Sequence, residues 1–250
     1  MKISFTFFVY TAESRTLKKS AFTLAEVLIT LGIIGVVAAM TLPVLTQKYQ
    51  KMVLKNQYKK VYSTLSQAYS KAVFDIGGDT GCVHVYEGKQ NSTNTASECK
   101  AFGNELRKSL KFIKVCQGNA LAGKCIPPAS YKSYSEVYKE FHPDMSENEV
   151  GQLESDCPYN KSQINNRNTV YVFNDGTIII DSRGDRNDYA PYAFLVDVNG
   201  QKGPNKWGYD LFKLSFVKEK NKQYRLMPAG CDVTEKGGTT SADMLKNMHI

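Results

Sequence analysis

The stretch AFTLAEVLITLGIIGVVAAMTLP, from Ala21 to Pro43, decides the fold, because it is an apolar run whose one formal charge is Glu26. From Phe22 to Leu45 there are 24 residues, and a helix of that length spans roughly 36 Å. This is enough to cross a bilayer with some tilt. A carboxylate at a bilayer centre costs roughly 2.5 kcal/mol or more, so the presence of Glu26 near the start of the run needs an explanation.

The helical pattern continues beyond the membrane segment. Apolar residues recur mostly at three- and four-residue steps, at Leu45, Tyr49, Met52, Tyr58, Val61, Leu65, Ala68, Ala72 and Ile76. Lysines lie between them and predict a solvated face, namely Lys48, Lys51, Lys55, Lys59 and Lys60. Gly77 and Gly78 favour a helix end. We therefore expect one helix over residues 22–77, transmembrane over 22–45, whose amphipathic second half packs against the rest of the chain.

Residues 78–250 are expected to form a globular domain that covers this helix. Strand-like runs occupy 169–173, 177–181, 192–198, 210–217 and 223–227. The turn residues Asn174-Asp175-Gly176 join the first two runs into a hairpin. Residues 98–113 predict a helix, residues 117–168 predict turns and short helices, and the Gly-, Thr- and Ser-rich tail after Cys231 predicts a mobile end. The fold class is α+β, a long N-terminal helix packed on an antiparallel sheet of four or five strands over about 169–227.

The first 21 residues form a basic leader. Lys2, Arg15, Lys18 and Lys19 against Glu13 give it a charge of +3. Because basic residues directly precede the apolar run, the positive-inside rule places the N-terminus in the cytoplasm. Everything after Leu45 should then be exported. The whole chain has a formal net charge of +8, and its basic residues outside the leader are scattered rather than clustered. This gives only weak grounds for nucleic acid as a partner.

The six cysteines all follow the apolar run. An even number on the exported side favours disulfides in an oxidising compartment over metal-bound or reduced thiols. Six cysteines permit 15 pairings, and sequence order alone suggests neighbours as partners, 82–99, 116–125 and 157–231. The candidates are Cys82, Cys99, Cys116, Cys125, Cys157 and Cys231.

One loop has residues suited to a cation. In DVNGQKGPNKWGYD, residues 197–210, Asp197, Asn199 and Asp210 supply oxygen atoms of the kind that Ca²⁺ prefers. An Asx-rich turn without metal explains the same residues. Trp207 is either a surface contact or an anchor for the loop. No Gly-rich phosphate loop, Ser/His/Asp order or paired-carboxylate pocket is present, so we expect no enzyme and no cofactor other than calcium.

The segment KKSAFTLAEVLITLGIIGVVAAMTLP, from Lys18 to Pro43, resembles the N-terminal segment of type IV pilins and type II secretion pseudopilins. The resemblance implies that prepilin peptidase cuts between Ala21 and Phe22 and methylates Phe22, although the family usually has Gly before the cut. It implies that Glu26 is the assembly carboxylate. It also implies that Gly35 and Pro43 bound a segment that loses helicity in filaments.

Cleavage before Phe22 makes Glu26 the fifth residue of the mature chain. In a stack of offset helices the new amine of one chain can pair with Glu26 of its neighbour, and this pairing sets the register. The implied partners are prepilin peptidase, identical or homologous pilin subunits and an inner-membrane assembly platform, with energy from a separate ATPase. The major pseudopilins also hold calcium in a loop near the C-terminus.

Three functions stay open at this point. The chain is expected to be a structural subunit of a type II secretion pseudopilus or of a type IV pilus that serves adhesion, motility or DNA uptake. The alternative is a membrane-anchored binding module or adhesin that never polymerises.

Overall fold

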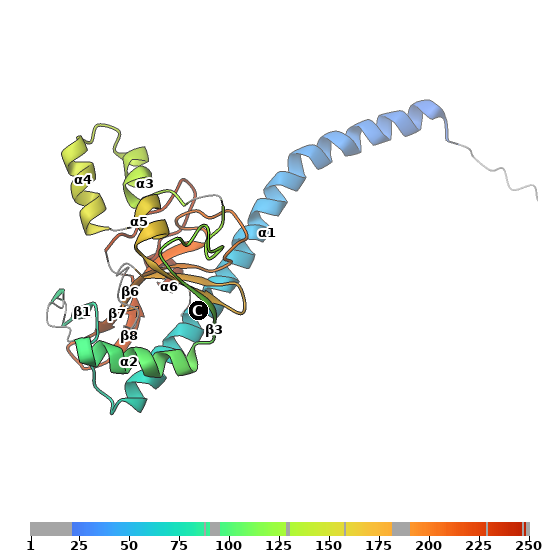
Figure 1. The fold of residues 1–250 in the computed structure, drawn as a ribbon. Coiled ribbons are helices and arrows are strands. Elements are labelled where there is room, and N and C mark those ends of the chain that lie inside the picture. Colours follow the sequence, from blue (N-terminus) through green and yellow to red (C-terminus); the bar gives the residue numbers. More distant parts are fainter. Residues whose placement is uncertain are drawn as a thin grey trace, which may run out of the picture. The chain divides into compact units, whose positions relative to one another are not determined.

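The computed structural model describes residues 22–87, 89–90, 96–128, 131–157, 159–181, 191–228, 230–246 and 248. The predicted leader, including Ala21, lies outside them. The chain divides into two compact units, one up to Lys48 and one from Tyr49 onward. The first holds the start of helix α1 (Leu24–Asp75), and the second holds the rest of α1 and the sheet (Figure 1).

Helix α1 is one continuous element of 52 residues. Its N-terminal half is long and apolar enough to cross a membrane. In the second unit its buried face begins at Leu54 and repeats at helical spacing, through Tyr58, Val61, Leu65, Ala68, Tyr69, Ala72 and Val73. The predicted apolar face begins at Leu45. Its first part is not buried, because Tyr49 and Met52 are 65% and 59% exposed, so the prediction was wrong there.

The sheet is an antiparallel meander, as predicted, with more strands than expected. The five predicted runs form β4 (Thr169–Phe173), β5 (Ile178–Asp181), β6 (Ala193–Asp197), β7 (Leu211–Lys218) and β8 (Tyr224–Met227). Strand β3 (Phe112–Gln117) pairs antiparallel with β4 and makes six. The short β1 (Val85–Tyr86) runs parallel to β7 and pairs with β2 (Lys89–Gln90), so the sheet has eight strands among the described residues.

The prediction of a helix over 98–113 was wrong at its C-terminal end. Helix α2 (Ala96–Ser109) stops there, and Phe112 already belongs to β3. Because β3 is an edge strand, only Cys116 of its six residues is buried. The chain therefore lacks the regular inside–outside alternation by which a strand is recognised in sequence.

Within the second unit, both faces of the sheet are covered (Figure 1). One face packs on α1 and α2, through aromatic side chains that include Tyr69, Phe102 and Phe216. The other face packs on α3 (Tyr134–Phe141), α5 (Lys161–Asn166) and the segment around Cys116 and Cys125. Helix α4 (Glu147–Asp156) packs on α3. The three layers explain why the central strands are apolar on both sides.

Disulfide bonds link neighbouring cysteines in the sequence, Cys82 to Cys99, Cys116 to Cys125 and Cys157 to Cys231. The first ties the segment after α1 to α2, and the last ties the end of α4 to the C-terminal segment. All three lie in the second unit.

The C-terminal segment packs on the domain, so the expectation of a mobile tail was wrong. The Glu235 amide donates to the Trp207 carbonyl oxygen at 2.9 Å. Met244, in α6 (Ser241–Lys246), is buried. Trp207 is 1% exposed and its Nε1 donates to the Lys132 carbonyl oxygen at 2.8 Å. Trp207 is therefore an anchor for the loop rather than a surface contact.

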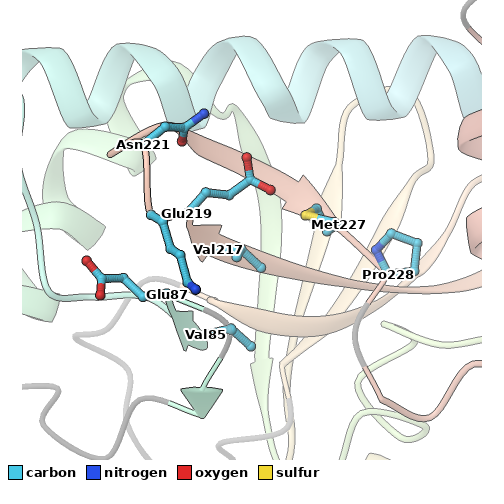
Figure 2. Close-up of a pocket in the computed structure, with 8 residues that line it drawn as sticks. Val85, Glu87, Val217, Glu219, Asn221, Met227 and Pro228 are labelled. Atoms are coloured by element: carbon cyan, nitrogen blue, oxygen red, sulfur yellow. The ribbon is translucent and has the colours of Figure 1, made fainter.

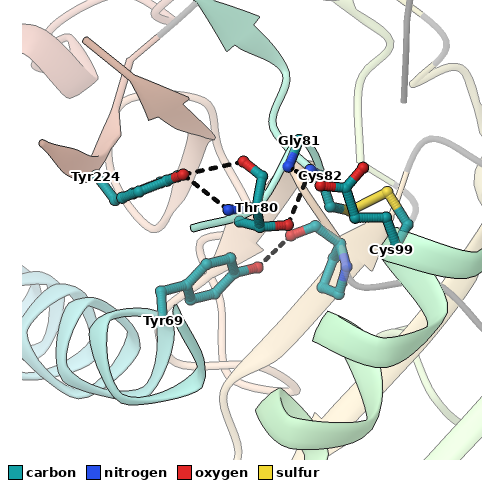
Figure 3. Close-up of a disulfide and its surroundings, with 8 residues drawn as sticks. Tyr69, Thr80, Gly81, Cys82, Cys99 and Tyr224 are labelled. Carbon is teal, nitrogen blue, oxygen red and sulfur yellow. Dashed lines mark hydrogen bonds between the residues drawn. A yellow bond between two sulfur atoms is a disulfide. The ribbon is translucent and has the colours of Figure 1, made fainter. Parts of the chain in front are cut away.

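A polar cluster fastens the chain after α1 to the last two strands. The Thr80 amide donates to the Tyr224 hydroxyl at 2.8 Å, beside the Cys82–Cys99 bond (Figure 3). The Asp79 carboxylate accepts from Lys218 Nζ and from the same hydroxyl. The Lys218 hydrogen bond is the main cause that lowers the pKa of Asp79 to about 2. The Lys218 side chain is 7% exposed, whereas that of Asp79 is 71% exposed.

Replacing Lys218 by Met should lower the free energy of unfolding at neutral pH by about 1 kcal/mol, because the ion pair is partly screened by solvent. The lowered pKa of Asp79 means that its contribution is present above its ordinary pKa of 3.8 and is lost as the pH falls through about 2. The difference between wild type and Lys218→Met should therefore shrink in acid. Urea unfolding of both proteins at neutral pH and near pH 2 tests this. If the two proteins differ in stability by the same amount at both pH values, the effect comes from packing alone.

Candidate functional site

The carboxylate of Glu26 caps the N-terminus of α1. Its Oε2 accepts hydrogen bonds from the Thr23 amide and the Thr23 hydroxyl, both at 2.8 Å. The Glu26 amide donates back to Thr23 Oγ1 at 3.2 Å. This is a capping box, in which two helix-end donors are satisfied reciprocally. The Thr-x-x-Glu spacing before the apolar run is the sequence signal for this box, which was not among the predictions.

The helix behind this cap is apolar on every side. Phe22 is 84% exposed and Leu24 is 77% exposed. Other large exposed apolar side chains of the segment are Val27, Leu28, Ile29, Leu31, Ile33, Ile34, Val36, Val37, Met40, Leu42, Val44 and Leu45. Nothing in the described part of the chain covers them. A helix that is hydrophobic all round is stable only when lipid or other helices surround it.

Gly35 and Pro43 lie inside α1, which stays helical at both. Pro43 has no amide hydrogen, so one helical hydrogen bond is missing there. The Thr46 hydroxyl donates to the carbonyl oxygens of Leu42 and Pro43, both at 2.9 Å. Gly35 has open space where a Cβ would stand. These features place two weak points in the helix, and any loss of helicity in a filament stays a prediction.

The loop over residues 197–210 brings two carboxylates into the interior. Asp197 ends β6 and Asp210 precedes β7, and both are fully buried. Asp197 Oδ1 accepts from the amides of Asn199 at 3.0 Å and Gly200 at 2.6 Å. Its Oδ2 accepts from the Tyr131 hydroxyl at 3.0 Å. The fold therefore holds the Asp197 side chain in one orientation.

The Asp210 carboxylate is held in the same way from the loop. It accepts hydrogen bonds from the amides of Asn205 and Lys206, each at 2.7 Å. Gly200 allows the loop to pass close to the β4–β5 turn, because a Cβ there would overlap the carbonyl oxygen of Gly176. Gly200 also has a φ of +64°, which favours glycine.

Burial changes the electrostatics of both aspartates in this loop. Burial, and then the charge of Asp210, raise the pKa of Asp197 well above its usual range. Burial also raises the pKa of Asp210 to about 6. Among the described residues, no lysine or arginine forms an ion pair with either carboxylate. Two buried carboxylates without a positive partner are costly when ionised, so either a proton or a counter-ion would neutralise them.

Two further oxygen atoms in the loop are available. Asn199 Oδ1 and Asn205 Oδ1 are buried and have no hydrogen-bond partner. The described residues contain no group of three or more His, Cys, Asp or Glu side chains suited to a metal ion. The loop thus carries two carboxylates and two amide oxygens, and oxygen atoms are ligands of the kind that Ca²⁺ prefers. Asn205 was not among the residues named from the sequence.

Comparison with known proteins identifies the N-terminal segment. Residues 16–42 match the family model described as the prokaryotic N-terminal methylation motif. No curated protein and no solved structure matches the chain. The match confirms the resemblance drawn from the sequence, and the motif belongs to a structural class of protein, not to an enzyme family. This segment is the prepilin-type signal of type IV pilins and pseudopilins, and the chain that follows it has a pilin-like α+β layout.

Proposed function

We propose that this chain is a structural subunit of a type II secretion pseudopilus, and that it works by polymerising through α1. Prepilin peptidase cuts between Ala21 and Phe22 and methylates Phe22. The subunit waits in the inner membrane with its N-terminus in the cytoplasm and the domain after Leu45 exported. The observation that carries this proposal is the prepilin signal on a helix whose apolar surface is uncovered. In a filament, neighbouring helices cover that surface in place of lipid.

Glu26 supplies the register of the polymer. Its bonds to Thr23 satisfy two donors of its own chain, and among the described residues no cation forms an ion pair with it. When helices stack with an axial offset, the Phe22 amine of one subunit reaches Glu26 of the next. A charge pair inside an apolar bundle forms only at the correct offset, because any other offset buries both charges unpaired.

The loop over residues 197–210 is the reason to favour a pseudopilus. Asp197, Asp210, Asn199 and Asn205 would hold Ca²⁺, and the bound ion would compensate the two buried carboxylates. The loop joins β6 to β7 and carries Trp207, so calcium would stabilise the connection on which the C-terminal segment packs. The resemblance to the major pseudopilins, which hold calcium in a loop near the C-terminus, supports this choice.

A type IV pilus is the second candidate, because its subunits carry the same N-terminal motif. Deleting the gene separates the two functions. Loss of folded proteins from the medium supports the pseudopilus, whereas loss of surface fibres, adhesion or DNA uptake with normal secretion supports the pilus. A full-length chain that is processed but never found in a polymer would instead support an anchored binding module.

Removal of calcium should destabilise the exported domain. At roughly 1 mM Ca²⁺, where extracellular calcium modules bind, we expect a higher melting temperature than in chelator. The gain corresponds to about 1.4 kcal/mol if the dissociation constant is roughly 0.1 mM. Thermal unfolding of the processed chain in detergent, with and without Ca²⁺, measures this.

The control compares two aspartates. Asp210→Asn should abolish the response to calcium, and Asp243→Asn, at an exposed position of α6, should leave it unchanged. Equal melting temperatures of the wild-type chain with calcium and with chelator would refute the calcium site.

A further inference from the structure

The start of the amphipathic half of α1 is left without a cover. Tyr49 and Met52 are both more than half exposed, although they continue the apolar pattern of the helix. Lys51, Lys55 and Lys59 follow at four-residue steps and so line one side of the helix. We call these five residues the lysine face. Residues 49–60 include no acidic residue.

A small hollow lies beside the lysine face. Its volume is about 120 Å³, and it is lined by Lys51, Leu54, Lys55, Gly208, Tyr209, Gly237, Thr239 and Met244. Lys51 Nζ donates to the Gly237 carbonyl oxygen at 3.1 Å and lies 5.7 Å from the centre of the Tyr209 ring. The hollow therefore combines an apolar floor with a positively charged rim. Such a site suits an aromatic side chain with acidic neighbours.

The acidic hairpin, which we define as residues 134–156 and which comprises α3 and α4, has these properties. It contains seven carboxylates and one lysine. Phe141 is 56% exposed at the end of α3, next to Glu140. Asp144 and Glu147 follow in the turn and at the start of α4, and both are exposed. In the described part of the chain, neither of these two carboxylates forms an ion pair.

Within one molecule the two surfaces do not meet. The lysine face is on α1, which packs on one side of the sheet, and α3 packs on the other side through Val137 (Figure 1). A contact between them therefore needs a second copy. Because the contact joins two different surfaces, each copy keeps one of each surface free for the next copy. Contacts of this kind produce open polymers when they do not close into a ring.

We propose that the acidic hairpin of one subunit docks on the lysine face of a second copy of this chain, with Phe141 in the hollow between Lys51 and Tyr209. This inference rests on the proposed function, and it names the surfaces that the exported domains use in the filament.

A larger groove of about 530 Å³ lies beside β1 and β8, over Val85, Val217 and Met227 (Figure 2). Its lining includes Glu87, Glu219 and one lysine, Lys220, so it offers an acidic partner no excess of positive charge.

Charge reversal tests the contact in the full chain expressed with its assembly machinery. Asp144→Lys with Glu147→Lys, and separately Lys51→Glu with Lys55→Glu, should each lower the yield of sheared filaments about tenfold or more, because like charges then face one another. Combining all four changes should restore most of the yield. Lys111→Glu with Lys114→Glu is the matched control and should assemble normally; both lysines are exposed, the first just before β3 and the second within it.

Photo-cross-linking identifies the surface directly. A benzoylphenylalanine at position 141 should cross-link to residues 49–60, 207–209 or 237–244 of a second copy. Wild-type filaments whose cross-links map elsewhere, or a four-fold variant that assembles no better than its parents, would overturn the contact and leave the proposed function intact. A wild-type chain that forms no filament with its machinery present would overturn both.

Discussion

Glu26→Gln should be inserted and processed normally but should yield about a hundredfold less filament than the wild type. Glutamine occupies the same position in capping boxes, so the bonds with Thr23 and the start of α1 are preserved. Only the charge is lost. Breaking a buried charge pair costs about 3 kcal/mol or more, and each 1.4 kcal/mol is a factor of ten. Immunoblots of sheared filaments, with mass spectrometry of Phe22 for cleavage and methylation, provide the measurement.

The control for this experiment removes the cap and keeps the charge. Thr23→Val eliminates the hydroxyl that bonds Glu26, at a cost of about 1 kcal/mol in helix stability. It should therefore assemble at a reduced but measurable level. If Glu26→Gln assembles as well as wild type while Thr23→Val does not, the carboxylate serves the helix end alone and the pairing with a neighbouring amine is wrong.

Loss of the Cys157–Cys231 bond should have the largest effect on the stability of the domain that contains the sheet. Its cysteines are 74 residues apart, whereas those of the Cys116–Cys125 bond are 9 apart. The chain-entropy model gives about 4 kcal/mol for the long loop and about 2.5 kcal/mol for the short one. The long bond also holds the C-terminal segment against Trp207. We therefore expect Cys157→Ala with Cys231→Ala to reduce the free energy of unfolding by about 4 kcal/mol.

Urea unfolding of the processed chain in detergent compares this double variant with Cys116→Ala plus Cys125→Ala. The order of the two losses is the result that matters, since each value depends on residual structure in the unfolded chain. A larger loss for the short loop would mean that local packing, not loop closure, governs these bonds.

Much of the fold was readable from the sequence because its signals are local. The apolar run defines the first half of α1, and the Asn174-Asp175-Gly176 turn defines the β4–β5 hairpin. Strand β3 was missed because an edge strand with one buried residue carries little alternation. The exposure of Tyr49 and Met52 was missed for a different reason. Helical periodicity shows that a face is apolar, but only the tertiary structure shows where its cover ends.

The two candidate sites also differ in how much of each could be predicted from the sequence. The N-terminal signal is a contiguous motif, so Phe22 and Glu26 could be named from sequence. The candidate site in the loop over residues 197–210 depends on burial, which comes from distant residues. Tyr131, which bonds Asp197, is 66 residues away from it in the sequence. The unpartnered oxygen of Asn205 likewise becomes meaningful only once the surrounding donors and acceptors are located.

The way that α1 is attached to the sheet governs how the domain responds to tension. Besides the buried face of α1, two polar contacts join the helix to the sheet region. Lys60 Nζ forms an ion pair with Asp175 at 3.0 Å, and the Tyr62 hydroxyl donates to the Leu226 carbonyl oxygen at 2.8 Å. These contacts are side-chain contacts distributed along several turns. A force applied along the helix axis therefore loads them in shear, and they share it instead of breaking one after another. If neighbouring subunits pull on the helix lengthwise, the domain should consequently resist extraction of its helix better than if the same contacts were loaded one at a time.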